Sequence, residues 1–329
     1  MGGHRIMAKF NKGYSNIKVK LLSFEGNNLA KRAYRFGVFG SDSYEIPNDN
    51  YKRDKYEVKR FVQEVLDGTT FPKFLMEATR IEFSVEGISR ICLAQLTRDN
   101  AIFCSESHGL RPLSQEFNIP LNIYNDASIM EKLTKAQELL ESAYVECCEK
   151  EIPFPESRYI CLHSQTISLT CSFTPAAFAR SCYSRTNNSF CDELNYVYRK
   201  MFFELRRAIC ALDDENSLTL WNWLINEKNC IDDNFYKRTN VFNGDFLPFE
   251  NRPVRRPAQN DWRKSCWKME LERMLQEEPY LLTQKEAKEI ARWQIVESAG
   301  ITLPTTYDEN LPRAAKNSIK TMPYYKENK

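Results

Sequence analysis

Residues 79–98 read TRIEFSVEGISRICLAQLTR, and this stretch decides the fold. Its first part, residues 79–86, places an apolar side chain at every second position, which predicts a strand with one buried face. These apolar residues are Ile81, Phe83 and Val85. A polar helix or loop with Arg90 and Arg98 follows. The chain is therefore expected to run from a buried strand directly into a segment with two guanidinium groups.

The same periodicities recur on both sides of this stretch. Residues 17–23 and 159–173 alternate apolar and polar positions, which predicts strands. Residues 54–66 and 190–211 repeat apolar side chains at helical spacing. A further helix is expected over residues 128–144, because a Ser-x-x-Glu capping box opens it. Together these elements predict a mixed α+β core.

The composition changes after residue 211. All five tryptophans lie beyond it, and residues 251–264 form a locally basic, Pro-rich loop. We expect an N-terminal tail over residues 1–14, a core over 15–211 and a mostly helical extension over 212–329. One hypothesis for the extension is that its tryptophans dock a partner protein or a single strand of nucleic acid.

The charge balance limits the classes of partner. Lys and Arg number 46 and Asp and Glu number 44 in 329 residues, so no global basic field attracts nucleic acid or an anionic membrane. No run approaches the roughly 18 apolar residues of a membrane span, and the first residues lack the apolar core of a secretory signal. We expect a cytoplasmic protein with no membrane partner, and nucleic acid is an improbable one.

The cysteines are expected to be reduced and structural. There are 11 of them, but no CxxC pair occurs, and the three histidines are far apart in the sequence. We therefore predict no metal site. The sequence also lacks a convincing Cys/His pair, so no protein nucleophile is expected.

Several short sequence motifs, called landmarks below, resemble motifs of one enzyme family. Residues 86–90 (EGISR) and 95–98 (QLTR) resemble the segment that leads into the arginine-rich signature of flavin-dependent thymidylate synthases. Residues 116–120 (EFNIP) are similar to the step that follows that signature. Arg158 and Arg185 lie 27 positions apart, like the two arginines that the family uses at its nucleotide. The landmarks occur in the family's order through most of the expected core.

The resemblance implies a fold and a reaction. The fold would be an α+β core with a mixed or antiparallel sheet and flanking helices. The reaction would be reductive methylation of dUMP to dTMP, in which methylenetetrahydrofolate supplies the carbon and FAD reduced by NADPH supplies the hydride. The resemblance also implies a homotetramer with sites at subunit junctions.

The resemblance assigns binding residues as well, and none as a catalytic nucleophile. The substrate residues would be Gln95, Glu106, Ser107, Arg111, Arg158 and Arg185. The cofactor residues would be Arg98, Asp99, Asn100 and Arg180.

The sequence departs from the family at the cofactor. The family's Arg-His-Arg triplet reads Arg98-Asp99-Asn100 here. The carboxylate of Asp99 is expected to repel the anionic parts of a flavin or folate unless a cation compensates for it. Arg180, which replaces an asparagine of the family, is one candidate to restore the lost charge.

Two functions are therefore open. The first is flavin-dependent methylation of dUMP or a close variant, such as hydroxymethylation of dUMP or dCMP. The second is a catalytically inactive nucleotide-binding or assembly protein that keeps the fold.

Overall fold

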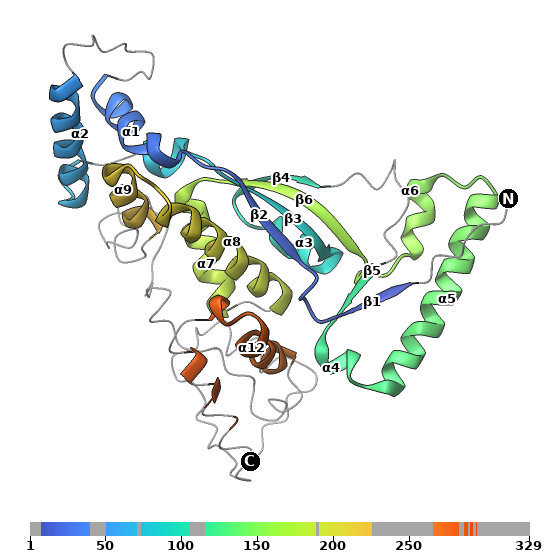
Figure 1. Cartoon of the computed structure of the whole chain (residues 1–329). Coiled ribbons are helices and arrows are strands. Elements are labelled where there is room, and N and C mark those ends of the chain that lie inside the picture. The colour runs from blue at the N-terminus through green and yellow to red at the C-terminus, as the bar shows by residue number, and fades with distance from the viewer. Residues whose placement is uncertain are drawn as a thin grey trace, which may run out of the picture.

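The computed structural model has a central sheet with helices on one face and an arm to one side (Figure 1). It describes residues 8–39, 51–70, 74–105, 116–188, 191–225 and 266–282, with residues 286–288, 290–291 and 294 beyond them.

The central sheet has the strand order β2-β3-β6-β4 and is antiparallel throughout. The predicted alternation in β3 is confirmed, because all three of its apolar residues named above are fully buried. The strands are β2 (Lys18–Ser23), β3 (Ile81–Ser89), β4 (Ala101–Ser105) and β6 (Thr166–Phe173).

A bulge near the end of β3 prepares the next helix. Gly87 has a φ of +77°, a conformation that favours glycine, and the pairing with β6 shifts register beside it. A Cβ at this position would lie 3.2 Å from Nδ2 of Asn16. Beyond the bulge, the side chain of Ser89 caps α3 (Arg90–Leu96) by accepting from the amide of Cys92.

Two helices cover one face of the sheet: α7 (Pro175–Asn188) and α8 (Asp192–Cys210). The ring of Phe178 in α7 stacks on Phe83, with 5.5 Å between centroids, and meets Phe173 edge-on at 5.7 Å. The helix expected near residues 190–211 is confirmed as α8, whose apolar face is fully buried.

A second group of helices packs at one end of the sheet. It contains α1 (Leu29–Phe39), α2 (Tyr51–Leu66) and α9 (Glu215–Ile225). Trp221 of α9 is fully buried against Phe24. Residues just beyond 211 therefore share the hydrophobic core of the preceding chain. Two short turns belong to this end, η1 (Gly26–Asn28) and η3 (Phe74–Ala78).

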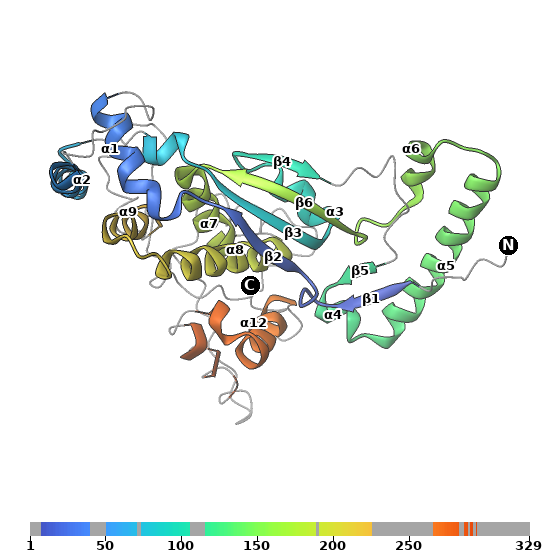
Figure 2. The same ribbon diagram turned by 45° about the horizontal axis from the view of Figure 1, so that its top comes forward.

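The arm extends from the other end of the sheet (Figure 2). It begins with β1 (Lys9–Lys12), which pairs in parallel with β5 (Glu116–Ile119). Its helical elements are α4 (Leu121–Tyr124), α5 (Ala127–Glu149), α6 (Phe154–Ser157) and η4 (Arg158–Ile160).

The predicted capping box of α5 is wrong. The N-cap is Asp126, whose carboxylate accepts from the amides of Ser128 and Ile129 at 3.0 and 3.1 Å. Because Asp126 stands two residues before Ser128, its carboxylate reaches the first free amides of the helix, and its negative charge is favourable at a helix N-terminus. Glu131 instead pairs with Lys135 along the helix.

Only the second half of the strand expected over residues 159–173 is a strand. The amide of Cys161 donates to the carbonyl of Arg158, and that of Gln165 donates to Leu162. These local turns use the backbone groups that a strand would offer to a neighbour, so the strand begins at Thr166.

The part of the extension that the structure describes from residue 266 onward is helical and docks on α8 through buried charges. It contains α12 (Cys266–Glu277) and η7 (Pro279–Leu281), which lie below α8 in Figure 2. The guanidinium of Arg199 in α8 donates to both carboxylate oxygens of Glu286, at 2.8 and 2.6 Å. Breaking such a buried pair would leave a charge without compensation, so the pair fixes where the extension lies.

A second buried carboxylate at this contact makes stability depend on pH. Glu270 is fully buried, and its Oε2 accepts from Nε of Arg273 at 2.9 Å. Burial raises the pKa of Glu270 to about 7, although Arg273 opposes the rise. The folded pKa thus exceeds the ordinary value, so the stability that the protonated form gives below about pH 4.5 is lost as pH rises through about 7.

In the native chain the free energy of unfolding should fall between pH 5 and 8, and Glu270 accounts for at most about 3 kcal/mol of this fall. We predict that Glu270→Gln removes that part of the fall, as measured by urea titrations at each pH. Glu277→Gln is the matched control, because Glu277 binds the same arginine but its side chain is 58% exposed. A Glu270→Gln protein that keeps the slope of the native chain would contradict this account.

Candidate functional site

Asp99 lies just beyond α3 and accepts hydrogen bonds from two side chains. Nε of Arg185 lies 3.0 and 3.2 Å from its two carboxylate oxygens, and Nη2 lies 2.6 Å from Oδ1. The hydroxyl of Tyr198 donates to Oδ2 at 2.7 Å. Arg185 belongs to α7 and Tyr198 to α8, so this cluster ties the end of α3 to both covering helices.

The cluster is electrostatically matched. Burial alone would lower the pKa of Arg185, but its hydrogen bonds to Asp99 raise that pKa above the ordinary value. Burial raises the pKa of the Tyr198 phenol, and the charge of Asp99 adds to the rise. Both groups therefore remain protonated donors at neutral pH. The cation that compensates Asp99 is Arg185, a residue that the sequence assigned to the substrate.

The other predicted cofactor residues surround this cluster loosely. Arg98 and Asn100 flank Asp99 and are exposed, whereas Arg180 is half-buried on α7. Their assignment to a cofactor stays a prediction.

The predicted substrate residues fall into separate places. Gln95 is half-buried in the last turn of α3, and its backbone carbonyl accepts from Nη2 of Arg185 at 3.4 Å. Glu106, Ser107 and Arg111 lie outside the described residues. Gln95 and Arg185 are thus the two that the structure brings together.

Arg158 lies at the opposite end of α3. It opens η4, and its titratable neighbours are Cys161 and Arg90. Burial lowers the pKa of Arg158, the Cys161 thiol raises it, and the guanidinium of Arg90 lowers it further. Arg90 begins α3 whereas Arg185 meets Asp99 beyond its end, and a helix of this length spans roughly 10 Å. Arg158 and Arg185 therefore have different neighbours within one chain.

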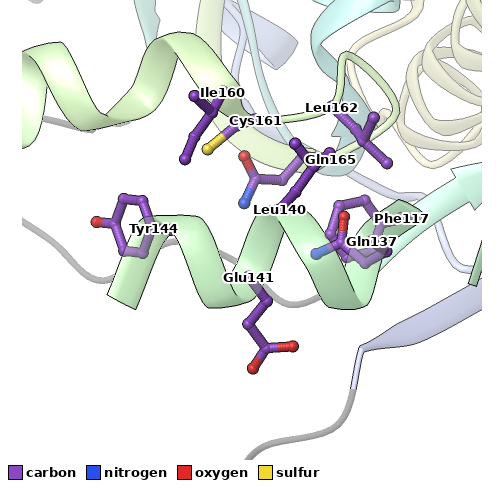
Figure 3. A pocket seen from close by; sticks show the side chains of 9 residues that line it. All are labelled: Phe117, Gln137, Leu140, Glu141, Tyr144, Ile160, Cys161, Leu162 and Gln165. Carbon is purple, nitrogen blue, oxygen red and sulfur yellow. The ribbon is translucent and has the colours of Figure 1, made fainter. Parts of the chain in front are cut away.

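A small pocket lies beside η4 (Figure 3). Figure 3 shows the amide side chain of Gln165 between Tyr144 on one side and Phe117 and Gln137 on the other. Its volume is sufficient for ordered water and is far below that of a nucleotide site. The remaining lining residues are Leu140, Glu141, Ile160, Cys161 and Leu162.

A buried carboxylate joins two of the sequence landmarks, EGISR and EFNIP, to the start of α8. Glu193, at the start of α8, accepts from the amide of Ser89 at 2.7 Å and also from its hydroxyl. Nδ2 of Asn118 in β5 donates to the same carboxylate at 2.8 Å. Burial raises the pKa of Glu193, and these hydrogen bonds oppose the rise. The partners of Glu193 lie in other segments, so this carboxylate joins the start of α8 to β3 and β5.

Sequence reasoning missed Ser89 and Asn118 as partners of Glu193. Both lie inside motifs that were recognised, EGISR and EFNIP, so the motifs themselves were the available signal. Within the described residues, no group of three or more His, Cys, Asp or Glu could hold a metal ion. The described helices include none that could cross a membrane.

We predict that Glu193→Ala lowers the free energy of unfolding by about 3 kcal/mol, because it leaves the buried donors of Ser89 and Asn118 without acceptors. Glu204→Ala, on the same helix but paired with the exposed Arg207, should cost less than about 1 kcal/mol. Urea unfolding monitored by circular dichroism measures both. Equal losses of unfolding free energy in the two variants would show that Glu193 contributes no more to stability than an ordinary surface carboxylate.

Two solved structures illustrate what the chain is similar to. One is a UMP/dUMP methylase PolB from Streptomyces cacaoi bound with 5-Br dUMP, at 14% identity and a TM-score of 0.46, covering 65% of this chain and 96% of that one. The other is the flavin dependent thymidylate synthase ThyX from Helicobacter pylori complexed with FAD and dUMP, at 18% identity and a TM-score of 0.40, covering 57% and 93%. No curated protein matches the sequence.

The family comparison covers β3, β4 and β6 of the central sheet and the two helices that cover its face, but not β2. The model of the family described as thymidylate synthase complementing protein matches residues 26–209, more than half of the chain. This range includes all the landmarks, from EGISR to Arg185, and also Glu193. The chain therefore belongs to the thymidylate synthase complementing protein family.

Proposed function

We propose that this protein methylates dUMP to dTMP with a folate one-carbon donor and a flavin, or performs a close variant such as hydroxymethylation of dUMP or dCMP. The observation that carries the proposal is family membership together with two arginine-containing clusters at the two ends of α3. Methylenetetrahydrofolate and NADPH are the proposed carbon donor and reductant.

Arg158 and Arg90 are suited to the phosphate of the nucleotide. Each guanidinium offers forked donors that match phosphate oxygens, and the two lie close enough to influence each other's charge. Arg111, Glu106 and Ser107 complete this proposed substrate set. Gln95 and Arg185, at the other end of α3, would orient the pyrimidine base.

The residues beside Asp99 fit a flavin nucleotide. An anionic diphosphate needs cations nearby, and Arg98 and Arg180 carry that charge, while Asp99 is already compensated by Arg185. When bound, the flavin supplies the hydride that completes the methyl group. The chain's own part is to hold the ligands and to exclude water between them.

A protein nucleophile is not needed for this proposal. Cys161 is the thiol beside Arg158, and burial raises its pKa even though Arg158 and Arg90 pull it down. A thiol held protonated at neutral pH is a poor nucleophile. Positioning and electrostatics are therefore the chain's proposed contribution to catalysis.

We propose that the active form is a homo-oligomer, with a homotetramer as the expected state. Helix α5 has 23 residues, and Gln137 is the one that is buried in a single chain. Leu139 and Val145 are 73% and 49% exposed on it. A second copy packed on this helix would cover that apolar surface.

A second candidate function is a catalytically inactive nucleotide-binding or assembly protein. The specific observation that favours it is the altered triplet, in which Asp99 uses Arg185 as its own partner. This candidate predicts nucleotide binding without bound flavin.

We predict that the purified protein shows flavin absorbance and converts dUMP with methylenetetrahydrofolate and NADPH to dTMP, measured by mass spectrometry. Arg158→Gln should weaken dUMP binding about tenfold to a hundredfold, since a guanidinium–phosphate contact is lost. Arg60→Gln, an exposed arginine on α2, should bind like the native chain.

The outcomes separate the two candidates. The absence of both flavin colour and a methylated or hydroxymethylated product would reject the enzyme. Calorimetric binding of dUMP under those conditions would favour the binding protein instead.

We also predict that Leu139→Glu reduces the oligomer to smaller species in light scattering, because it places a charge in the proposed apolar interface. Glu138→Ala, at the neighbouring exposed position of α5, is the matched control and should leave the mass unchanged. A monomeric native chain would contradict the proposed assembly.

A further inference from the structure

The contacts of Arg185 use one edge of its guanidinium completely. Nε faces both oxygens of Asp99, and Nη2 binds Oδ1 at 2.6 Å. The second hydrogen of Nη2 points to the carbonyl of Gln95 at 3.4 Å, a longer contact. The two hydrogens of Nη1 make no hydrogen bond with the residues that the structure describes. Nη1 is therefore the nitrogen of Arg185 that remains to bind a ligand.

The carboxylate that occupies Arg185 is itself held firmly. The Asp99 side chain is 8% exposed and the Arg185 side chain 20%, so the pair is partly screened from water. The Tyr198 hydroxyl adds a further hydrogen bond to Oδ2 at 2.7 Å. A phosphate could take the same edge of Arg185 only by displacing a carboxylate that has three donors.

The charges lead to the same conclusion. Asp99 and Arg185 together are neutral, so a phosphate dianion near them gains little from the arginine and is repelled by the aspartate. A forked contact with phosphate needs two neighbouring nitrogens, and Nη2 is already engaged. An uncharged acceptor oxygen, such as a carbonyl, needs only Nη1.

We infer that Asp99 is a specificity-determining and positioning residue: it excludes phosphate from Arg185 and orients the guanidinium so that Nη1 receives an uncharged acceptor. The inference rests on the proposed function, because it assumes that a pyrimidine nucleotide binds beside α3. It assigns the phosphate to other cations and makes Asp99 act through Arg185 without touching the ligand.

The test compares dUMP with deoxyuridine, which lacks the phosphate, on the full chain by calorimetry. Asp99→Asn keeps the shape and the Tyr198 partner but removes the negative charge. The substitution should raise the affinity for dUMP about tenfold and change the affinity for deoxyuridine less than about twofold. The reason is that the freed charge of Arg185 acts on the phosphate alone. Asp67→Asn, an exposed carboxylate after α2, should change neither ligand.

Arg185 variants give the complementary result. Arg185→Gln in the native background should weaken the binding of dUMP and the binding of deoxyuridine by the same factor, since the lost contact is to an uncharged group that both ligands share. In the Asp99→Asn background the same change should abolish the gain for dUMP. A structural role of Asp99 alone would shift the melting temperature but not the ratio of the two affinities.

Contrary results would be informative. An unchanged ratio in Asp99→Asn, or an Arg185→Gln loss confined to dUMP, would overturn the inference while the proposed function stands. If the native chain and all variants bind neither ligand, the inference and the proposed function fail together. Should Asp99→Asn not fold, Asp99→Ser removes the same negative charge and must raise the ratio of dUMP to deoxyuridine affinity in the same direction, or the inference falls.

Discussion

The carboxylate of Glu193 is the constraint on which the arrangement of the site depends. It is buried at the start of α8 and binds Ser89 at the end of β3 and Asn118 in β5. A buried carboxylate without such donors would cost several kcal/mol, so three distant segments are held in one register. Because Ser89 also caps α3, this junction sets the direction of that helix and the places of its two ends.

The sequence predicted the elements whose own periodicity is strong. The alternation in β3 and the helical pattern of α8 identified both, because each buries one face against the other. The errors occurred where a side chain or a turn bonds locally to backbone. Asp126 starts α5 earlier than the Ser-x-x-Glu box, and the turn at Arg158 delays β6. Periodicity carries no signal for such local competition between backbone partners.

The candidate site was predictable as a set of residues but not as a set of contacts. The sequence indicated that Asp99 would need a compensating cation, and the structure supplies one from 86 positions away. That cation, Arg185, had been assigned to the substrate, because spacing along a chain cannot tell a ligand contact from an ion pair. The pairing of Arg199 with Glu286 was equally hidden, since it joins the core to an extension without a recognised counterpart.

The two ends of α3 differ in charge, and this difference gives the proposed site a polarity. One end carries Arg90 and Arg158, and the guanidinium of Arg90 helps to lower the pKa of Arg158. The other end carries Arg185 already neutralised by Asp99. A mononucleotide has the same polarity, because its phosphate is anionic and its base is uncharged at neutral pH. On the proposed function, the direction that the Glu193 junction gives to α3 therefore decides which end of the ligand each cluster can accept.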